Sequence, residues 1–169
     1  MLTAEQIKSS FNALNEELRR QGHKGEIGIV GGAVMCLIYN ARSATRDVDA
    51  VFEPSHIIRQ AAAKIAGDLG LPSDWLNDGA KAYLIKDFAR HDYLKLSNLL
   101  VWAPEPKYML AMKCISARWD SSDRDDVIFL TNHLGIKTPK GVFDIIQTYY
   151  PHSMIPPKTK FFVEELLQE

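Results

Sequence analysis

Apolar residues near the amino terminus recur at the spacing of a helix. Thr3 and Gln6 are placed to form a capping box, and one apolar face continues until Gly22 ends the pattern. A short run rich in isoleucine and valine follows at residues 26–30, which is typical of a buried strand. A pair of glycines ends that run, and residues 33–40 then predict a short, mostly apolar helix. The chain therefore begins with the order helix, strand, helix.

A second strand is predicted at residues 47–52, where charged and apolar side chains alternate before the run becomes apolar. Helical spacing returns at residues 58–69 and ends at a glycine. Residues 71–90 mix turn formers with large hydrophobic side chains, so we expect a structured loop there. Residues 93–96 and 99–103 predict two further strands, joined as a hairpin.

The last third of the chain shows only the pattern of helices. Apolar spacing, together with acidic or proline starts, predicts four of them, at residues 107–118, 123–134, 139–150 and 159–167. Because the strands are confined to the first two thirds, the order is that of an α+β protein. We expect a single domain, with a small mixed sheet flanked by helices at about 26–105 and a helical part at about 106–169.

Composition narrows the classes of function. The 169 residues are 46% hydrophobic, and 20 basic against 21 acidic residues leave a net charge of −1, so nucleic-acid binding would need a local basic patch. Cys36 and Cys114 lie in apolar stretches that predict buried thiols, and the five histidines share no zinc-ligand spacing. No apolar run approaches the ~18 residues of a membrane span, and the start lacks a signal-peptide pattern. We expect a cytoplasmic protein without membrane contacts.

The predicted strand at 47–52 carries two carboxylates. Residues two apart on a strand point to the same side of a sheet, so Asp47 and Asp49 are expected about 6 to 7 Å apart and facing one way. Mg²⁺ takes oxygen ligands and is normally shared between one or two carboxylates and substrate phosphates. Chemistry on a triphosphate depends mainly on charge neutralisation and in-line positioning. The pair therefore predicts a divalent-metal site that handles a nucleoside triphosphate.

A pair of glycines precedes these carboxylates by about fifteen residues. Gly31 and Gly32 lie between a predicted strand and a predicted helix, where missing side chains let phosphate oxygens approach backbone N–H groups. Adjacent strands would bring this turn and the aspartates to the same edge of the sheet. Either feature alone is more often a tight turn or a polar strand start, and only their combination favours a nucleotide site.

The residues around these two features resemble the signature of the nucleotidyltransferase superfamily, which is a glycine pair followed by Asp-x-Asp on the next strand. Here Gly31-Gly32 precedes Thr45-Arg46-Asp47-Val48-Asp49 by about a dozen residues. A later stretch is similar to a block of the AbiEii-like, abortive-infection branch, with a lysine and an arginine on one helix and acids opening the next. It consists of Leu110-Ala111-Met112-Lys113, Ala117-Arg118 and Asp123-Arg124-Asp125-Asp126-Val127. The similarity spans about residues 26–136.

The resemblance implies a nucleotidyltransferase fold and an enzyme that moves a nucleoside monophosphate from a nucleoside triphosphate to tRNA, another RNA, a protein or a small molecule. It also implies Mg²⁺ or Mn²⁺ as the cofactor. Because the AbiEii-like branch includes toxins of toxin–antitoxin systems, a cognate antitoxin is an implied partner. Carried over residue by residue, the resemblance assigns catalysis and metal binding to Asp47 and Asp49. It assigns nucleotide binding to Gly31, Gly32, Arg46, Lys113 and Arg118.

The chain departs from the family pattern in one respect. Many members add a third carboxylate on a later strand as a general base, but residues 93–103 contain no acid, and Asp92 and Glu105 only flank them. The metal alone could then activate the acceptor, or the chain could be an inactive module that binds a partner protein or nucleic acid. A dinucleotide-binding unit around residues 28–32 is a third interpretation, although the third glycine of that motif is missing.

Several of these residues also have structural interpretations. Arg46 can be an exposed arginine at a strand edge, and Lys113 can extend its ammonium group from an apolar helix to solvent. The acids that follow residue 122 suit a helix N-terminus. Asp126 is in addition placed to orient Lys113 or Arg118.

Overall fold

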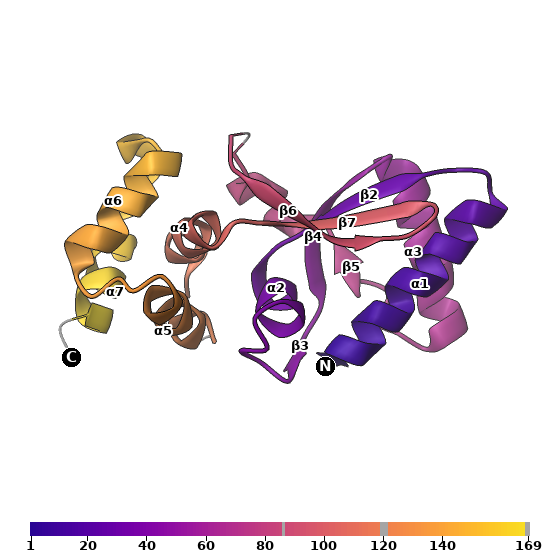
Figure 1. Ribbon diagram of the computed structural model, residues 1–169, viewed down its shortest axis with the longest axis horizontal. Helices are drawn as coiled ribbons and strands as arrows, with labels where there is room; N and C mark the ends of the chain where they lie inside the picture. The colour runs from indigo at the N-terminus through magenta and orange to yellow at the C-terminus, as the bar shows by residue number, and fades with distance from the viewer. Residues whose placement is uncertain (86, 119–121, 168–169) are drawn as a thin grey trace. The chain divides into compact units, whose positions relative to one another are not determined.

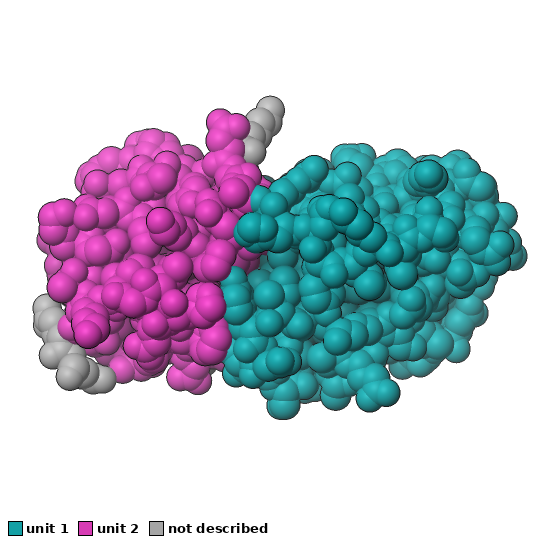
Figure 2. Space-filling view, in the orientation of Figure 1, with its two compact units in different colours: residues 1–82, 90–103 teal, residues 83–89, 104–169 magenta. Residues whose placement is uncertain are grey.

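The computed structural model describes residues 1–85, 87–118 and 122–167, and it has the predicted α+β architecture. The chain forms two compact units, which are coloured separately in Figure 2. Residues 1–82 and 90–103 make unit 1, which contains the sheet, and residues 83–89 and 104–169 make unit 2, which is helical. The division next to residue 104 lies close to the predicted boundary between the sheet region and the helical part.

Unit 1 is built on a mixed five-stranded sheet with the strand order β5-β4-β2-β7-β6 (Figure 1). Its strands are β2 (Gly25–Ile29), β4 (Val48–Glu53), β5 (Leu76–Asn77), β6 (Arg90–Lys95) and β7 (Leu99–Pro104). The central strand β2 pairs antiparallel with β4 and parallel with β7. A separate two-stranded pairing joins β1 (Leu2–Thr3) to β3 (Ala44–Thr45).

Two helices, α1 (Ala4–Arg20) and α3 (Ser55–Leu69), pack together against one face of this sheet (Figure 1). The capping box of α1 forms as predicted, since the Gln6 backbone N–H donates to Thr3 Oγ1 over 3.2 Å and the Thr3 N–H donates to Gln6 Oε1 over 2.9 Å. A Cβ built on Gly25 would lie 3.0 Å from methyl groups of both Leu18 and Ile58, so the odd-numbered residues of β2 face the helices.

The opposite face of the sheet carries the alternate positions of β2 and β4, namely Glu26, Gly28, Asp49, Val51 and Glu53, and we call it the aspartate face. A Cβ on Gly28 would lie only 2.2 Å from Cζ2 of Trp102, so the indole ring occupies the space that a side chain would fill. The guanidinium of Arg90 lies 4.7 Å from the centre of the Trp102 ring and pairs with Glu26 at 2.8 Å. Trp102 is therefore held in place on both sides.

Unit 2 has a central helix, and its neighbours pack around it. The helices are α4 (Pro106–Ser116), α5 (Asp123–His133), α6 (Pro139–Tyr149) and α7 (Pro157–Leu167). The other three contact α4, whose residues from Tyr108 to Ile115 are all buried. Aromatic rings complete this core, because Phe88 stacks on Tyr108 at 4.1 Å and the Tyr150 hydroxyl donates to the Tyr83 carbonyl over 2.6 Å.

A buried ion-pair network joins α4 to α5. The ammonium group of Lys113 is 2.7 Å from carboxylate oxygens of both Asp123 and Asp126. Lys113 is 7% exposed and Asp126 only 2% exposed, so these charges are removed from water and depend on one another. Of the two partners predicted for Asp126, which were Lys113 and Arg118, the ion pair with Lys113 is found.

Most predicted elements are found within two or three residues of their expected bounds, but the short ones were missed. The helix expected from residue 33 begins at the glycine turn as α2 (Gly31–Leu37), and the loop expected at 71–90 contains β5 and a 3₁₀ helix (Gly79–Tyr83). A second 3₁₀ helix, His152–Met154, also lacked a signal. Among the described residues, no helix is both long and apolar enough to cross a membrane.

Both cysteines are buried, as predicted. Burial raises the pKa of the Cys114 thiol to about 12 and also raises the pKa of Cys36. Because a thiol needs its thiolate form to react, neither side chain is suited to nucleophilic chemistry in the native protein.

We predict that Gly28→Ala destabilises the protein by about 2 kcal/mol, because the added methyl group would overlap the fixed Trp102 ring. Urea unfolding followed by circular dichroism measures the change. Gly67→Ala in α3 is the matched control: apart from the adjoining backbone of its own helix, nothing lies within 4 Å of the new Cβ, so the better helix propensity of alanine should stabilise by about 0.8 kcal/mol. Equal effects of the two substitutions would contradict the close packing at Gly28.

We also predict that Asp126→Ala costs about 3 kcal/mol, because it leaves the buried Lys113 ammonium with Asp123 as its remaining acidic partner in this network. Asp125→Ala removes an exposed acid from the same first turn of α5 and should cost less than about 1 kcal/mol. The same unfolding measurement compares the two variants. A small effect at both positions would show that the network adds little to the stability of unit 2.

Candidate functional site

The glycine turn and the second aspartate lie against each other in unit 1. Gly31 begins α2 with φ +62°, and a Cβ built on it would lie 3.2 Å from Oδ2 of Asp49. The backbone N–H of Val30 donates to the carbonyl oxygen of Asp49 over 2.9 Å. Because β2 and β4 run antiparallel, the end of the first strand meets the start of the second. The predicted meeting of the two features at one edge of the sheet is confirmed.

The two aspartates share the aspartate face, and Asn77 connects them. Asp49 and Asn77 are directly paired in the parallel register of β4 and β5, so their side chains point to the same side. The Asn77 side-chain amide donates to Oδ2 of Asp47 over 3.3 Å. The side chain of Asp47 is thereby directed toward the same face, although Asp47 precedes β4 and does not belong to it. Both carboxylates are half-buried.

Asn77 was not predicted as a site residue because it lies in the stretch interpreted as a loop. It forms half of a strand only two residues long, for which the sequence has no periodic signal. Its side chain is fixed at both ends, since its Oδ1 also accepts a hydrogen bond of 3.0 Å from the Gly79 N–H. At the level of Asp49, the neighbouring strand therefore offers an amide side chain.

The second glycine allows the turn to pack closely on the segment that leads into β4. A Cβ on Gly32 would lie 2.5 Å from Oγ1 of Thr45 and 3.3 Å from Nη1 of Arg42. The Thr45 hydroxyl in turn donates to the Asp47 carbonyl over 3.2 Å, which fixes the bend before the strand. Arg42 thus places a guanidinium at the turn.

The remaining predicted nucleotide-binding residues are distributed over both units. Arg46 is exposed in the bend immediately before Asp47. Lys113 and Arg118 belong to unit 2. The Lys113 ammonium is engaged by the two carboxylates of the buried network, and the Arg118 backbone N–H donates to Oδ2 of Asp123 over 3.2 Å. A structural role of Lys113 is thereby established, and phosphate binding by Arg46, Lys113 and Arg118 stays a prediction.

Two acids, Asp92 and Glu105, were considered as replacements for the third carboxylate, and the structure gives each of them another partner. Asp92 is on β6, separated from β4 by two strands or about 14 Å, and it pairs with Lys95 at 2.9 Å. Glu105 accepts a hydrogen bond of 2.5 Å from the Tyr149 hydroxyl in unit 2. Burial, together with this carboxylate, raises the pKa of Tyr149.

The donor set at the edge of the sheet fits a magnesium ion that is shared with a substrate. Two carboxylates provide hard oxygen ligands, and the absence of a side chain at Gly31 lets one of them, Asp49, lie close against the glycine turn. In the part of the chain that the structure describes, no group of three acidic, histidine or cysteine side chains could enclose a metal ion. Tight binding of the ion would therefore depend on oxygens of the substrate.

Comparisons with family models, with curated proteins and with solved structures found no match to this chain. A function is consequently indicated by the arrangement of Gly31, Asp47 and Asp49 and by the chemistry of the two carboxylates.

Proposed function

We propose that this protein is a Mg²⁺-dependent nucleotidyltransferase that transfers a nucleoside monophosphate from a nucleoside triphosphate to an RNA, protein or small-molecule acceptor. The observation that carries the proposal is that the Asp49 carboxylate lies against the turn at Gly31. A Cβ built on Gly31 would be 3.2 Å from Asp49 Oδ2, and Asp47 lies on the same face of the sheet. A mixed sheet with this pair at one edge also supports a nucleotidyltransferase fold. The similarity to the AbiEii-like branch suggests a toxin with a cognate antitoxin.

Each side chain has a distinct task under this proposal. Asp47 and Asp49 would hold Mg²⁺ or Mn²⁺, whose charge neutralises the triphosphate when it is bound. Gly31 carries no side chain next to Asp49, so that phosphate oxygens could approach the backbone N–H groups of the turn. Asn77 holds the Asp47 carboxylate toward the same face. An oriented pair needs less reorganisation when the substrate arrives, which favours binding in one geometry.

A second function is favoured by a specific observation. Residues 93–103 contain no acid, Asn77 beside Asp49 is an amide, and the described residues contain no cluster of three metal ligands. An inactive module of the same fold would lack the third carboxylate in this way, and it would bind a partner protein or nucleic acid. Calorimetry with Mg²⁺ and nucleoside triphosphates separates the two functions, because the inactive module should show no metal-dependent binding.

We predict that Asp49→Asn lowers nucleotide transfer by more than about 100-fold. Even the loss of an outer-shell partner costs 10- to 100-fold at metal sites, and here a direct ligand would lose its charge. Purified protein is incubated with labelled nucleoside triphosphates, Mg²⁺ and total RNA or cell lysate, and label on the acceptor is counted.

The matched control is Asp92→Asn, which removes one carboxylate of unit 1 far from the pair and should leave transfer within about twofold. Thermal melts of both variants check the fold. Full transfer by the Asp49 variant would refute the proposed role of the pair, and absence of any transfer by the wild type would favour the inactive module.

A further inference from the structure

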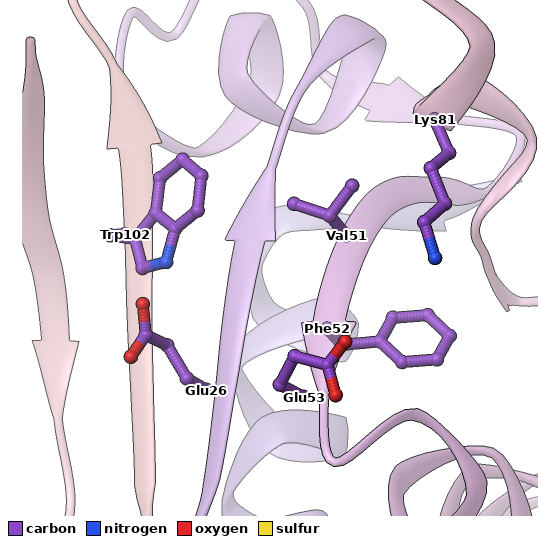
Figure 3. Close-up of a pocket in the computed structure, with 6 residues that line it drawn as sticks. All are labelled: Glu26, Val51, Phe52, Glu53, Lys81 and Trp102. Carbon is purple, nitrogen blue, oxygen red and sulfur yellow. The ribbon is translucent and has the colours of Figure 1, made fainter. Parts of the chain in front are cut away.

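A pocket of about 180 Å³ opens in unit 1 on the aspartate face (Figure 3). It is lined by Glu26, Val51, Phe52, Glu53, Lys81 and Trp102. None of these residues was predicted from the sequence as a site residue, and none has a task in the proposed function. The pocket nevertheless shares strand β4 with the aspartate pair.

Alternation along β4 puts the pocket in line with the metal site. Asp49, Val51 and Glu53 point to the same side, at about 6 to 7 Å from one to the next along the strand. A triphosphate bound at Asp49 carries its ribose and base several ångströms away from the metal. The pocket around Val51 is a concave site on the same face within that reach.

The floor of the pocket is apolar and fixed. Val51 is half-buried, and the Trp102 ring is 6% exposed, since it lies over Gly28 on one side and under the Arg90 guanidinium on the other. Because these side chains are already fixed, binding costs them little conformational entropy. A flat, rigid ring as the ligand also loses less freedom than a flexible chain would. The size of the pocket admits one such ring system.

The polar rim offers one acceptor and one donor. Glu26 and Glu53 are directly opposite each other in the antiparallel register, but in Figure 3 their side chains extend in opposite directions, with the Glu26 carboxylate next to Trp102. Arg90 neutralises Glu26 through a contact of 2.8 Å, whereas Glu53 is exposed at the end of its strand. Lys81, exposed on the 3₁₀ helix Gly79–Tyr83, extends toward β4 in the same view.

An amino-bearing nucleobase matches this rim. The exocyclic amino group of adenine or cytosine can donate to the Glu53 carboxylate, and a ring nitrogen or carbonyl can accept from the Lys81 ammonium. Uracil presents a carbonyl oxygen where cytosine has its amino group, so a carboxylate would face an oxygen and repel it. Charge and hydrogen bonding therefore discriminate between bases of the same size.

We propose that this pocket is the base subsite of the nucleotide site and selects adenine or cytosine nucleotides over uracil nucleotides. The proposal rests on the proposed function, since it requires that the aspartate pair hold the triphosphate. It names the class of substrate that the site prefers.

The test measures binding by calorimetry with Mg²⁺ and four probes: inorganic tripolyphosphate, ATP, CTP and UTP. Tripolyphosphate reports on the aspartate pair alone, and the nucleotides add the base. Wild-type protein should bind ATP or CTP at least about tenfold more tightly than UTP, the effect of one charge-assisted hydrogen bond. Glu53→Ala should reduce this ratio to within about twofold and leave tripolyphosphate affinity unchanged.

Two further variants complete the design. Val51→Trp should fill the pocket and lower the affinity for ATP and CTP toward that for tripolyphosphate, and the open face of a strand tolerates tryptophan. Asp92→Ala removes a carboxylate of the same sheet outside the pocket and should change none of the affinities. Melting temperatures establish that each variant is folded.

The outcomes separate this inference from the proposed function. If Asp49→Asn does not weaken tripolyphosphate binding, or the wild type does not bind it, the proposed function fails and the base subsite fails with it. If Asp49→Asn abolishes that binding but the wild type binds UTP as tightly as ATP and CTP, only the base subsite is overturned. A base preference that survives Glu53→Ala also overturns it.

Discussion

The antiparallel pairing of β2 with β4 is the constraint on which the candidate site depends. It sets the register in which Ile29 lies opposite Ala50, so the chain leaves β2 at the level where Asp49 points out of the sheet. A shift of one residue would turn Asp49 into the face covered by α1 and α3, where an unpaired carboxylate is costly. The same register presents apolar residues to those helices, so the energy of the core also holds the aspartates in place.

Glycine serves this arrangement at three positions for different reasons. Gly28 makes room for the Trp102 ring, Gly31 takes a left-handed backbone conformation beside Asp49, and Gly32 allows Thr45 to approach. A side chain at any of them would separate elements that the site needs in contact. The packing that stabilises unit 1 and the geometry that could bind a nucleotide therefore impose the same requirement on the sequence.

The long elements and the aspartate pair could be predicted because their signals are local. The capping box at Thr3, the alternation at 47–52 and the glycine pair each act within a few residues, and the structure has all of them. Asn77, by contrast, comes to Asp47, thirty positions earlier in the chain, through the pairing of its two-residue strand with β4. No periodicity marks so short a strand, and its position follows from tertiary packing.

Lys113 shows a different limit of prediction from the sequence. The sequence placed it correctly on a helix and beside the acids of the next helix, but chemical type alone does not distinguish a lysine that binds phosphate from one that balances buried carboxylates. The distances of 2.7 Å to Asp123 and Asp126 establish the second role. The pocket at Val51 could not be predicted from the sequence, because its lining residues come from separate strands and a 3₁₀ helix that meet only in the folded unit.

The route of the chain through the two units has a consequence for dissecting the protein. Residues 83–89 leave unit 1, and residues 90–103 then return to supply β6 and β7. Since β7 pairs directly with β2, a fragment that stops at residue 82 would lose the strand beside the centre of its sheet and expose an open backbone edge prone to self-association. Unit 1 is therefore a discontinuous piece of sequence, and truncation from the carboxyl end is expected to yield an aggregating polypeptide instead of an isolated sheet domain.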